Sequence, residues 1–443
     1  MKHLQANDDA QNLKMAVISP STAFIQPQVY FGVIQGHISD LQLNTAALSG
    51  MLAPWSLIQG NTTVTEITPD KNSLKLSTGK ELSYKSLVLA PGFAHESSHI
   101  DGLVDMEHGD ETNNTWVHTF NNLDAHNTNR NFYNGYQSLS GDNIVYSPKF
   151  PYKGEGCDFY ALYYEHMMRQ DKLTGLAAEN ATIQYWTPNK EIYRFPYANE
   201  VALEECAKRG IQVMFGWEML SVKTTETGEK VATFRNVDTG ETIEKDFNSA
   251  SINPPSKPHD FIVKSGLADS QGLIDVNRYT LQHRKYENVF AFGDAISGDT
   301  TRTMYGAQAQ NPIVKHNVLQ YLHGRDCNAI YDGYTYMPFL NGTRYASGFE
   351  HLHDFEPASM NHCMPAYGIF GQLYLRRHMK SSTATATAYA GLKKDHGPPH
   401  FRYSKVHDPL SHNEYLISKQ VPLEEVRHPA AQARFIAESP QVV

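Results

Sequence analysis

Short apolar runs alternate with amphipathic segments along most of the chain. Five of these runs predict strands: residues 15–18, 82–89, 143–147, 181–186 and 211–215. The last part of residues 82–89 is continuously apolar, which is typical of a strand buried on both faces of a sheet. Helical spacing is found over residues 158–170 and 198–209, and Gly210 follows the second segment as a helix stop. Strands that alternate with helices predict an α/β fold with parallel, doubly wound sheets.

Two segments have the pattern of antiparallel structure instead. Residues 62–76 alternate apolar and polar positions around Pro69-Asp70 and predict a hairpin. Residues 220–247 predict a β-meander with a turn at Thr239-Gly240. The polar residues 107–141 have only a weak period, which favours a polar helix.

The last third of the chain has a different character. From Met364 to Arg377 the chain predicts a helix with Ala366, Phe370 and Leu373 on one face. This helix has three interpretations: contact with a membrane surface through its aromatic and arginine side chains, contact with a partner protein, or an ordinary core helix. From residue 381 onward the Ser/Thr/Ala-rich and then Pro/His-rich composition predicts an extended tail suited to wrapping another protein.

Composition excludes several function classes. The 443 residues carry a net charge of −9, which is unsuited to sequence-independent nucleic-acid binding. No stretch approaches the roughly 20 apolar residues that span a bilayer. The four cysteines form no C-x-x-C pair, and His396, His400 and His407 do not have a zinc-site spacing, so we expect no metal. Residues 1–14 lack the apolar region of a targeting segment.

The segment with the most specific chemistry is NVFAFGD at residues 288–294. An apolar strand that runs into Gly293-Asp294 allows a dinucleotide to approach the backbone, and the carboxylate accepts a hydrogen bond from a ribityl hydroxyl of FAD. A helix that begins near Thr301 would then direct its N–H groups at the flavin ring. The plainer alternative is a strand followed by an ordinary turn.

Three other segments accompany this motif. They are LSYKSLVLAPG, which ends in Ala90, Pro91 and Gly92, then Ile252-Asn-Pro-Pro255, and then Tyr331-Asp-Gly-Tyr-Thr335. In this order and spacing the set resembles the flavoproteins with two dinucleotide-binding domains, of the FAD-dependent pyridine nucleotide-disulfide oxidoreductase type. Within them the chain resembles the mitochondrial sulfide:quinone oxidoreductases over roughly residues 1–380.

The resemblance implies two Rossmann-like domains with parallel sheets and β-meander insertions. The implied limits are residues 1–140 with 272–325 for the FAD-type domain and residues 141–271 for the second domain. Residues 326–380 would form a C-terminal helical region that faces a membrane or a partner, and residues 381–443 the tail. The family is mitochondrial and associated with the inner membrane, and it passes electrons from sulfide through FAD to a quinone.

The resemblance also implies a set of cofactor-binding residues, which are Gly293, Asp294, Ala90, Pro91, Gly92, Gln26, Pro27 and Arg302. Arg302 stands where the family has a lysine. The second Rossmann half opens at Ala181 without a glycine-rich loop, so we expect no NAD.

The chain departs from the family pattern at several positions. No G-x-G-x-x-G occurs, so the first domain is expected to lack its first strand and glycine-rich loop. Ser19 occupies the position of the acidic ribose ligand. The two family cysteines are replaced by Gly154 and Met337, and Cys157 is a weak substitute with no obvious partner. A thioether cannot form the disulfide that sulfide oxidation requires.

Three hypotheses follow from these observations. The first is a catalytically inactive member that has lost FAD and is kept as a structural subunit of a mitochondrial membrane complex, bound to other protein subunits. The second is an active FAD-dependent quinone oxidoreductase whose N-terminal strand is missing from this chain. The third is a soluble α/β binding protein unrelated to flavin. We favour the first, because four separate elements of the family site are replaced.

Overall fold

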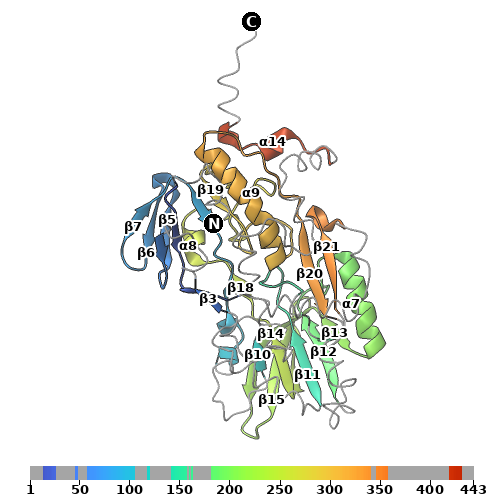
Figure 1. Cartoon of the computed structure of the whole chain (residues 1–443). Helices are drawn as coiled ribbons and strands as arrows, with labels where there is room; N and C mark the ends of the chain where they lie inside the picture. The colour runs from blue at the N-terminus through green and yellow to red at the C-terminus, as the bar shows by residue number, and fades with distance from the viewer. Residues whose placement is uncertain are drawn as a thin grey trace.

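The computed structural model describes residues 13–25, 45–47, 57–104, 117–119, 141–156, 159, 161–162, 181–340, 346–357 and 419–431. Figure 1 shows two α/β parts, with helix α9 at the upper end and a parallel sheet at the lower end. The α/β class with parallel sheets, which the alternation of strands and helices predicts, is confirmed. The predicted domain limits stay a prediction.

The upper part is built from short parallel pairs and an antiparallel sheet. β1 (Ala16–Ile18) pairs with β4 (Leu57–Gln59), and β8 (Leu87–Leu89) pairs with β19 (Val289–Ala291), both in parallel. Helix α9 (Met304–Leu322) packs against β19. The antiparallel sheet and its surroundings comprise β5 (Val64–Thr68), η3 (Pro69–Lys71), β6 (Ser73–Leu76), β7 (Glu81–Ser83) and α8 (Asp260–Lys264).

The lower part contains a five-stranded sheet in which every pair is parallel. Its spatial order is β10 (Val117–Thr119), β17 (Ser249–Ile252), β11 (Asp142–Tyr146), β12 (Thr182–Thr187) and β13 (Gln212–Phe215). The predicted meander packs against this sheet as β14 (Trp217–Thr224), β15 (Lys230–Asn236) and β16 (Thr242–Phe247). Helix α7 (Pro196–Arg209) ends at Gly210, whose φ of +68° is the left-handed conformation that caps a helix.

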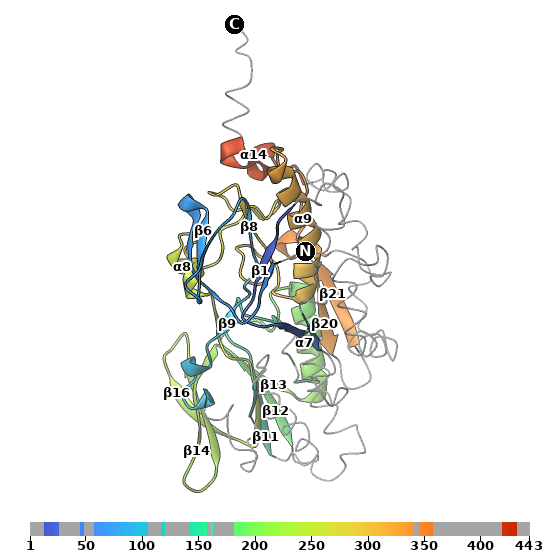
Figure 2. The same ribbon diagram turned by 60° about the vertical axis from the view of Figure 1, so that its left-hand side comes forward.

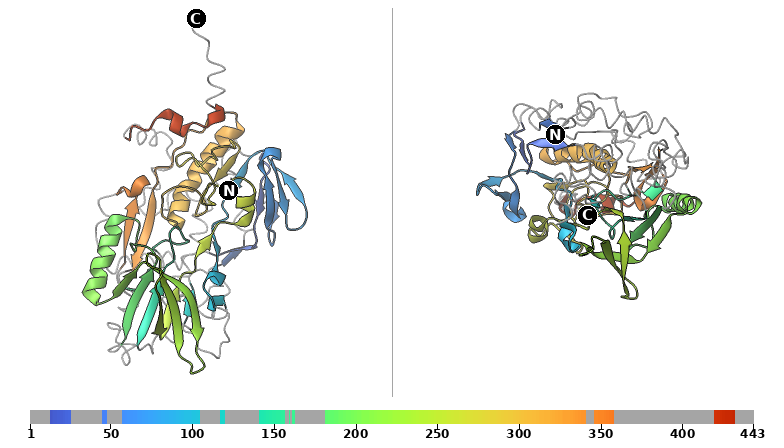
Figure 3. Two further views of the ribbon diagram at one scale, coloured as in Figure 1. Left: turned by 180° about the vertical axis from the view of Figure 1, so that it is seen from behind. Right: turned by 90° about the horizontal axis from the view of Figure 1, so that it is seen from below.

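Short pairs and turns link the two parts. They are β2 (Ala23–Ile25) with β3 (Thr45–Ala47), β9 (Ala94–His95) with β18 (Ser256–Lys257), and η4 (Ser97–His99). The hairpin of β20 (Thr335–Leu340) and β21 (Ala346–His351), followed by η8 (His353–Phe355), lies beside α7 (Figure 3).

Each part has its own apolar core. In the upper part, the buried residues of β19, including Phe290, pack with the inner face of α9, including Ile313. In the lower part, Trp186 of β12 stacks on Phe234 of β15 with ring centroids 4.1 Å apart. Burial of these side chains is the main favourable contribution to the stability of both parts.

Two sequence predictions differ from the structure. The single strand expected over residues 82–89 is divided, because β7 pairs antiparallel with β6 while β8 pairs in parallel with β19. The bend between them is fixed by Asn288, whose carbonyl accepts a hydrogen bond from Ser86 Oγ at 3.1 Å. The described part of the expected helix 107–141 is strand β10, which adds to the edge of the parallel sheet. The predicted helix from Met364 to Arg377 lies outside the described residues, as does most of the helix expected at 158–170.

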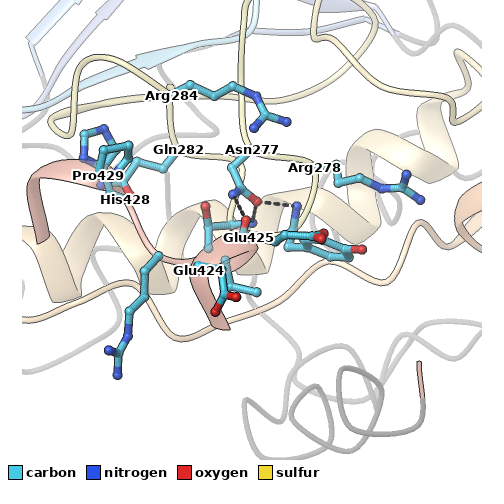
Figure 4. A pocket seen from close by; sticks show the side chains of 12 residues that line it. Asn277, Arg278, Gln282, Arg284, Glu424, Glu425, His428 and Pro429 are labelled. Atoms are coloured by element: carbon cyan, nitrogen blue, oxygen red, sulfur yellow. Dashed lines mark hydrogen bonds between the residues drawn. The ribbon is translucent and has the colours of Figure 1, made fainter. Parts of the chain in front are cut away.

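Residues 419–431 of the predicted tail pack on the upper part. Helix α14 (Leu423–Val426) lies next to the end of α9 in both Figure 1 and Figure 2. Val426 is buried against Tyr279 and Ile330. Asn277 donates from Nδ2 to the carbonyl of Glu425 at 2.5 Å, and a cavity of about 480 Å³ lies at this seam (Figure 4).

Candidate functional site

The Gly-Asp motif lies at the carboxyl end of β19. Because β8 is its parallel neighbour, Ala90, Pro91 and Gly92 follow β8 at the same edge. Gly293 has a φ of +87°, which favours glycine. Its N–H donates to Gln310 Oε1 at 2.7 Å, so a side chain of α9 already occupies this backbone donor.

Asp294 and Lys153 form the charged part of this edge. Both are half-buried, and neither makes an ion pair within 4.0 Å of a described residue. Burial raises the pKa of Asp294, and the positive charges of Lys153 and Arg302 oppose that rise. Burial lowers the pKa of Lys153, and Asp294 opposes the decrease. The two groups stabilise each other's charge and remain available to a ligand.

His95, on β9, is a neighbour of Lys153 that sequence reasoning missed. Both of its ring nitrogens are buried without a hydrogen-bond partner. Burial, and then the charge of Lys153, lower its pKa to about 3, so the ring is neutral. A neutral imidazole offers one donor and one acceptor. Nothing in the local sequence singles out this histidine among the 21 in the chain.

A buried ion pair lies beside Gly154. Glu155 is 1% exposed, and Arg194 donates to its Oε2 from Nη2 at 2.5 Å and from Nε at 3.0 Å. Burial raises the pKa of Glu155, while Arg194 and Arg302 oppose that rise. Arg194 also donates to the carbonyl of Thr300 at 3.1 Å, so it links the lower part of the molecule to the loop before α9.

Arg302, the replacement for the family lysine, is 3% exposed. Its Nη atoms donate to the carbonyls of Ile296, Gly298 and Thr300 at 2.9–3.1 Å. The guanidinium therefore holds its own loop in shape. Helix α9 begins after this loop, as the sequence predicts, with Thr303 Oγ1 accepting from the N–H of Gly306 at 3.1 Å as an N-cap.

The structure brings together the two segments that carry the family cysteine positions. Met337, on β20, is fully buried. A methyl group on Gly156, two residues after Gly154, would overlap Met337 Sδ and the ring of Tyr193. Gly154 itself has a φ of +76°. The two segments are in contact at Gly156, but glycine and a thioether cannot exchange sulfur or hold it covalently.

The cysteines within the described residues do not fill this role. Cys206, on α7, and Cys327, after α9, are unpaired. Burial raises the pKa of each thiol to about 12, which removes the thiolate that a nucleophile needs. The candidate Cys157 lies outside the described residues.

The adenosine end of the predicted cofactor site is only partly described. Gln26 and Pro27 lie outside the described residues. Ser19 follows β1, and its Oγ accepts from the N–H of Ser21 at 3.2 Å. This hydroxyl therefore caps a local turn. It stands at the position where the resemblance implies an acidic side chain that binds the ribose.

The ribityl end does fit an FAD. Asp294 and Lys153 form no ion pair with any residue that the structure describes, and His95 has two buried polar atoms without a partner that a bound polar molecule would satisfy. Asp294 would accept from a ribityl hydroxyl, and Lys153 and His95 would bind polar edges of the cofactor. FAD, when bound, supplies two-electron redox chemistry. Among the described residues, no group of three His, Cys, Asp or Glu is placed to hold a metal ion.

No family model matches the chain. It is similar to the mitochondrial sulfide:quinone oxidoreductase of Schizosaccharomyces pombe, with 26% identity over 339 residues that cover 76% of this chain and 68% of the relative. The corresponding mouse protein is also 26% identical, over 333 residues that cover 74% of this chain and 70% of the relative.

Solved structures share the fold. A chain of the Tetrahymena thermophila mitochondrial ATP synthase has a TM-score of 0.78 and 25% identity, covering 88% of this chain and 93% of that one. The sulfide:quinone oxidoreductase of Aquifex aeolicus has a TM-score of 0.63 and 16% identity, covering 88% and 89%. The predicted resemblance to the mitochondrial sulfide:quinone oxidoreductases is therefore confirmed, on a fold of the FAD-binding Rossmann type.

Proposed function

We propose that this protein is a sulfide:quinone oxidoreductase-like accessory subunit that does not oxidise sulfide. The observation that carries the proposal is the pairing of Met337 with the loop that contains Gly154 and Gly156. Sulfide oxidation through sulfur needs a disulfide between two cysteines: hydrosulfide attacks one sulfur, which keeps the added sulfur atom, and the other cysteine leaves as a thiolate. Neither atom required for this step is present at the two positions.

A place in a mitochondrial membrane complex is supported by one comparison. The match with the Tetrahymena ATP synthase chain covers 93% of that chain, and its TM-score of 0.78 is higher than the 0.63 of the Aquifex enzyme. The curated relatives are mitochondrial by name, which supports a mitochondrial location beside the inner membrane. In the described part of the chain, no helix is long and apolar enough to cross a bilayer. In the proposed assembly other protein subunits would hold the chain, and the stretch from Met364 to Arg377 is a candidate for membrane-surface contact.

The loss of FAD remains a prediction. The chain's own residues at the ribityl end favour an alternative, which is an FAD-dependent quinone oxidoreductase with another electron donor. The specific observation behind it is the pair of buried, unpartnered ring nitrogens of His95, next to Lys153 and, through Lys153, to Asp294. In this alternative Asp294 would orient the cofactor and the buried Glu155–Arg194 pair would fix the loop beside it.

The absorbance spectrum and turnover of the purified full chain test the proposal. We expect no sulfide-dependent reduction of a soluble quinone, with or without added FAD. Cys157→Ser is the matched variant, and Cys206→Ser and Cys327→Ser are controls. The proposal that the protein does not oxidise sulfide would be refuted if the unmodified chain showed sulfide-dependent turnover, if Cys157→Ser abolished it and if the two control variants retained it.

The proposed assembly is tested separately on native gels of gently solubilised mitochondrial membranes. The protein should migrate at the mass of a large complex in constant ratio to its subunits. Migration only as a free chain of about 50 kDa under conditions that preserve the complex would refute the accessory role.

A further inference from the structure

The two parts of the molecule have the same order of strands. In the lower part β11, β12 and β13 are followed by the meander of β14, β15 and β16 and then by β17. In the upper part β1 and β4, with the pair β2–β3 between them, are followed by the antiparallel sheet of β5, β6 and β7 and then by β8. β12 pairs with β13 in parallel as β1 does with β4, and β17 pairs with β10 as β8 does with β19. The two parallel sheets are therefore built to one plan.

The two sheets differ at one strand position. In the lower sheet β11 lies between β12 and β17 and pairs with both in parallel. The matching edges in the upper part belong to β1 and β8, and no strand that the structure describes pairs with either edge. We call the position between these two edges the slot. By comparison with β11, the slot takes a strand that runs parallel to β1 and β8.

The backbone of β8 directs hydrogen-bonding groups into the slot. The N–H of Leu87 donates to the carbonyl of Asn288 at 2.9 Å, so Leu87 faces β19. The carbonyl of Leu89 accepts from the N–H of Phe292 at 3.1 Å, so Leu89 faces β19 as well. Successive residues of a strand direct their N–H and C=O groups to opposite edges. The backbone groups of Val88 therefore point into the slot.

The backbone of β1 is oriented in the same way by its pairing with β4. The carbonyl of Met15 accepts from the N–H of Leu57 at 2.9 Å, so Met15 faces β4. By the same alternation, the N–H and C=O groups of Ala16 and Ile18 point to the opposite edge, which is the slot. Both edges therefore offer backbone donors and acceptors to a strand placed between them.

Side chains beside the slot are more exposed than those at the matching places of the lower sheet. Val88, the second-last residue of β8, is 37% exposed, whereas Ser251, the second-last residue of β17, is 4% exposed. Ala16 of β1 is exposed, whereas residues 183–187 of β12 are all buried. Apolar strand residues that are open to water beside an unpaired edge form a template for pairing with another strand.

The strand β11 shows which kind of segment fills this position. Residues 143–146 of β11 are each no more than 4% exposed. A strand that is covered on both edges and on both faces consists of a nearly continuous apolar run. The matching occupant of the slot is an extended apolar segment of about five residues, the length of a typical strand.

The residues before β1 and the described strands do not supply such a segment. A parallel neighbour of β1 from the same chain needs a strand and a crossover of about a dozen residues, whereas 15 residues precede Ala16 in this sequence. Among residues 2–12, Leu4 is the only large apolar side chain. Every strand that the structure describes is already part of a sheet, so a second copy of the chain offers none of these strands. A segment of a different polypeptide needs no crossover, and it fits.

We propose that an apolar strand of another protein subunit binds in the slot, parallel to β1 and β8. Its main chain would exchange hydrogen bonds with Ala16, Ile18 and Val88, and its alternate side chains would cover the two faces of the completed sheet. The proposal rests on the assembly proposed above, for which it names the contact surface. It is independent of whether the protein oxidises sulfide.

Photo-crosslinking in the assembled complex tests the occupant of the slot. The photoreactive residue p-benzoylphenylalanine replaces Val88 in the full chain assembled in mitochondria. In a matched control it replaces Val237, which is 45% exposed and follows β15 in the lower part. After irradiation of the membranes, mass spectrometry identifies the cross-linked peptides. We expect position 88 to reach one apolar run of another polypeptide, and position 237 not to reach that run.

The outcomes separate this proposal from the proposed assembly. The chain could comigrate with a large complex on native gels while position 88 cross-links only to this chain, to a longer form of it or to nothing. That result would overturn the strand proposal and leave the assembly intact. Migration only as a free chain would overturn both.

Variants at Val88 test the backbone contact itself. Val88→Pro removes the N–H that points into the slot but leaves the hydrogen bonds from β8 to β19 in place. We expect the share of the chain in the complex to fall about two- to tenfold, the factor that one lost hydrogen bond gives. Val88→Thr keeps the N–H and should keep most of this share. A Val88→Pro chain that folds and assembles as well as Val88→Thr contradicts the role of β8. If Val88→Pro does not fold, cross-linking from position 88 still decides.

Discussion

Arg194 offers the sharpest test of the buried ion pair beside Gly154. The Arg194→Met change keeps most of the side-chain volume but removes the charge that faces Glu155, whose side chain is 2% exposed. Glu155 would then be a buried carboxylate without its main partner. Breaking one side of a buried ion pair costs about 3–5 kcal/mol. Arg194 also lies over the rings of Phe150 and Phe355, at 5.6 and 5.2 Å, which adds about 0.5–1 kcal/mol to the expected loss.

The sign of the pH dependence follows from Glu155. Burial raises its folded-state pKa above the unfolded value, so ionisation in the folded state costs stability as the pH rises through that range. Without Arg194 this cost increases at neutral pH. We therefore expect Arg194→Met to be more destabilising at pH 8 than at pH 5.

The assay is chemical denaturation of the full chain in a double-mutant cycle with Glu155→Gln. The double variant should recover most of the stability lost in Arg194→Met, because no buried charge remains. Lys223→Met is the matched control, since its pair with Glu244 spans 2.8 Å but both side chains are more than half exposed. That control should lose less than about 1 kcal/mol. An Arg194→Met loss no larger than the Lys223→Met loss would refute the reasoning.

Two further changes have defined outcomes. Gly156→Ala should lower the midpoint of thermal unfolding by far more than Gly141→Ala. Both glycines have positive φ, but only at Gly156 would the methyl group overlap Met337 and Tyr193. Equal decreases in the two midpoints would contradict the packing described. Between pH 6.5 and 5 the unfolded His95 binds a proton, whereas the folded His95, with a pKa of about 3, stays neutral. The free energy of unfolding therefore decreases over this range by up to about 2 kcal/mol because of His95, and His95→Phe should remove this decrease. Denaturant titrations at several pH values measure this, and an unchanged slope would exclude a neutral buried His95.

Local sequence patterns were sufficient to predict the positions of most of the strands. The β14–β16 meander, the β5–β6 hairpin and the end of α7 at Gly210 lie where alternation and turn residues predict them. These elements are specified by residues near one another in the chain. The division of residues 82–89 was not predictable in this way, because Asn288, far along the sequence, fixes the bend.

The candidate site shows the same distinction. Gly293-Asp294 and the cysteine positions were found because motifs mark them. No motif marks Glu155 or Arg194, yet they form the buried pair beside Gly154. This pair depends on how the loops that follow the neighbouring strands β11 and β12 fold against each other, which neither segment specifies by itself.

The packing of α14 has a consequence for how the protein forms. Val426 covers Tyr279 and Ile330, so residues near the carboxyl end complete a surface that belongs to the upper part. The ribosome releases these residues after every other described element of the upper part. The upper part therefore cannot reach its final state before Val426 has been synthesised, and a shortened chain that stops after Lys380 would leave Tyr279 and Ile330 without this cover.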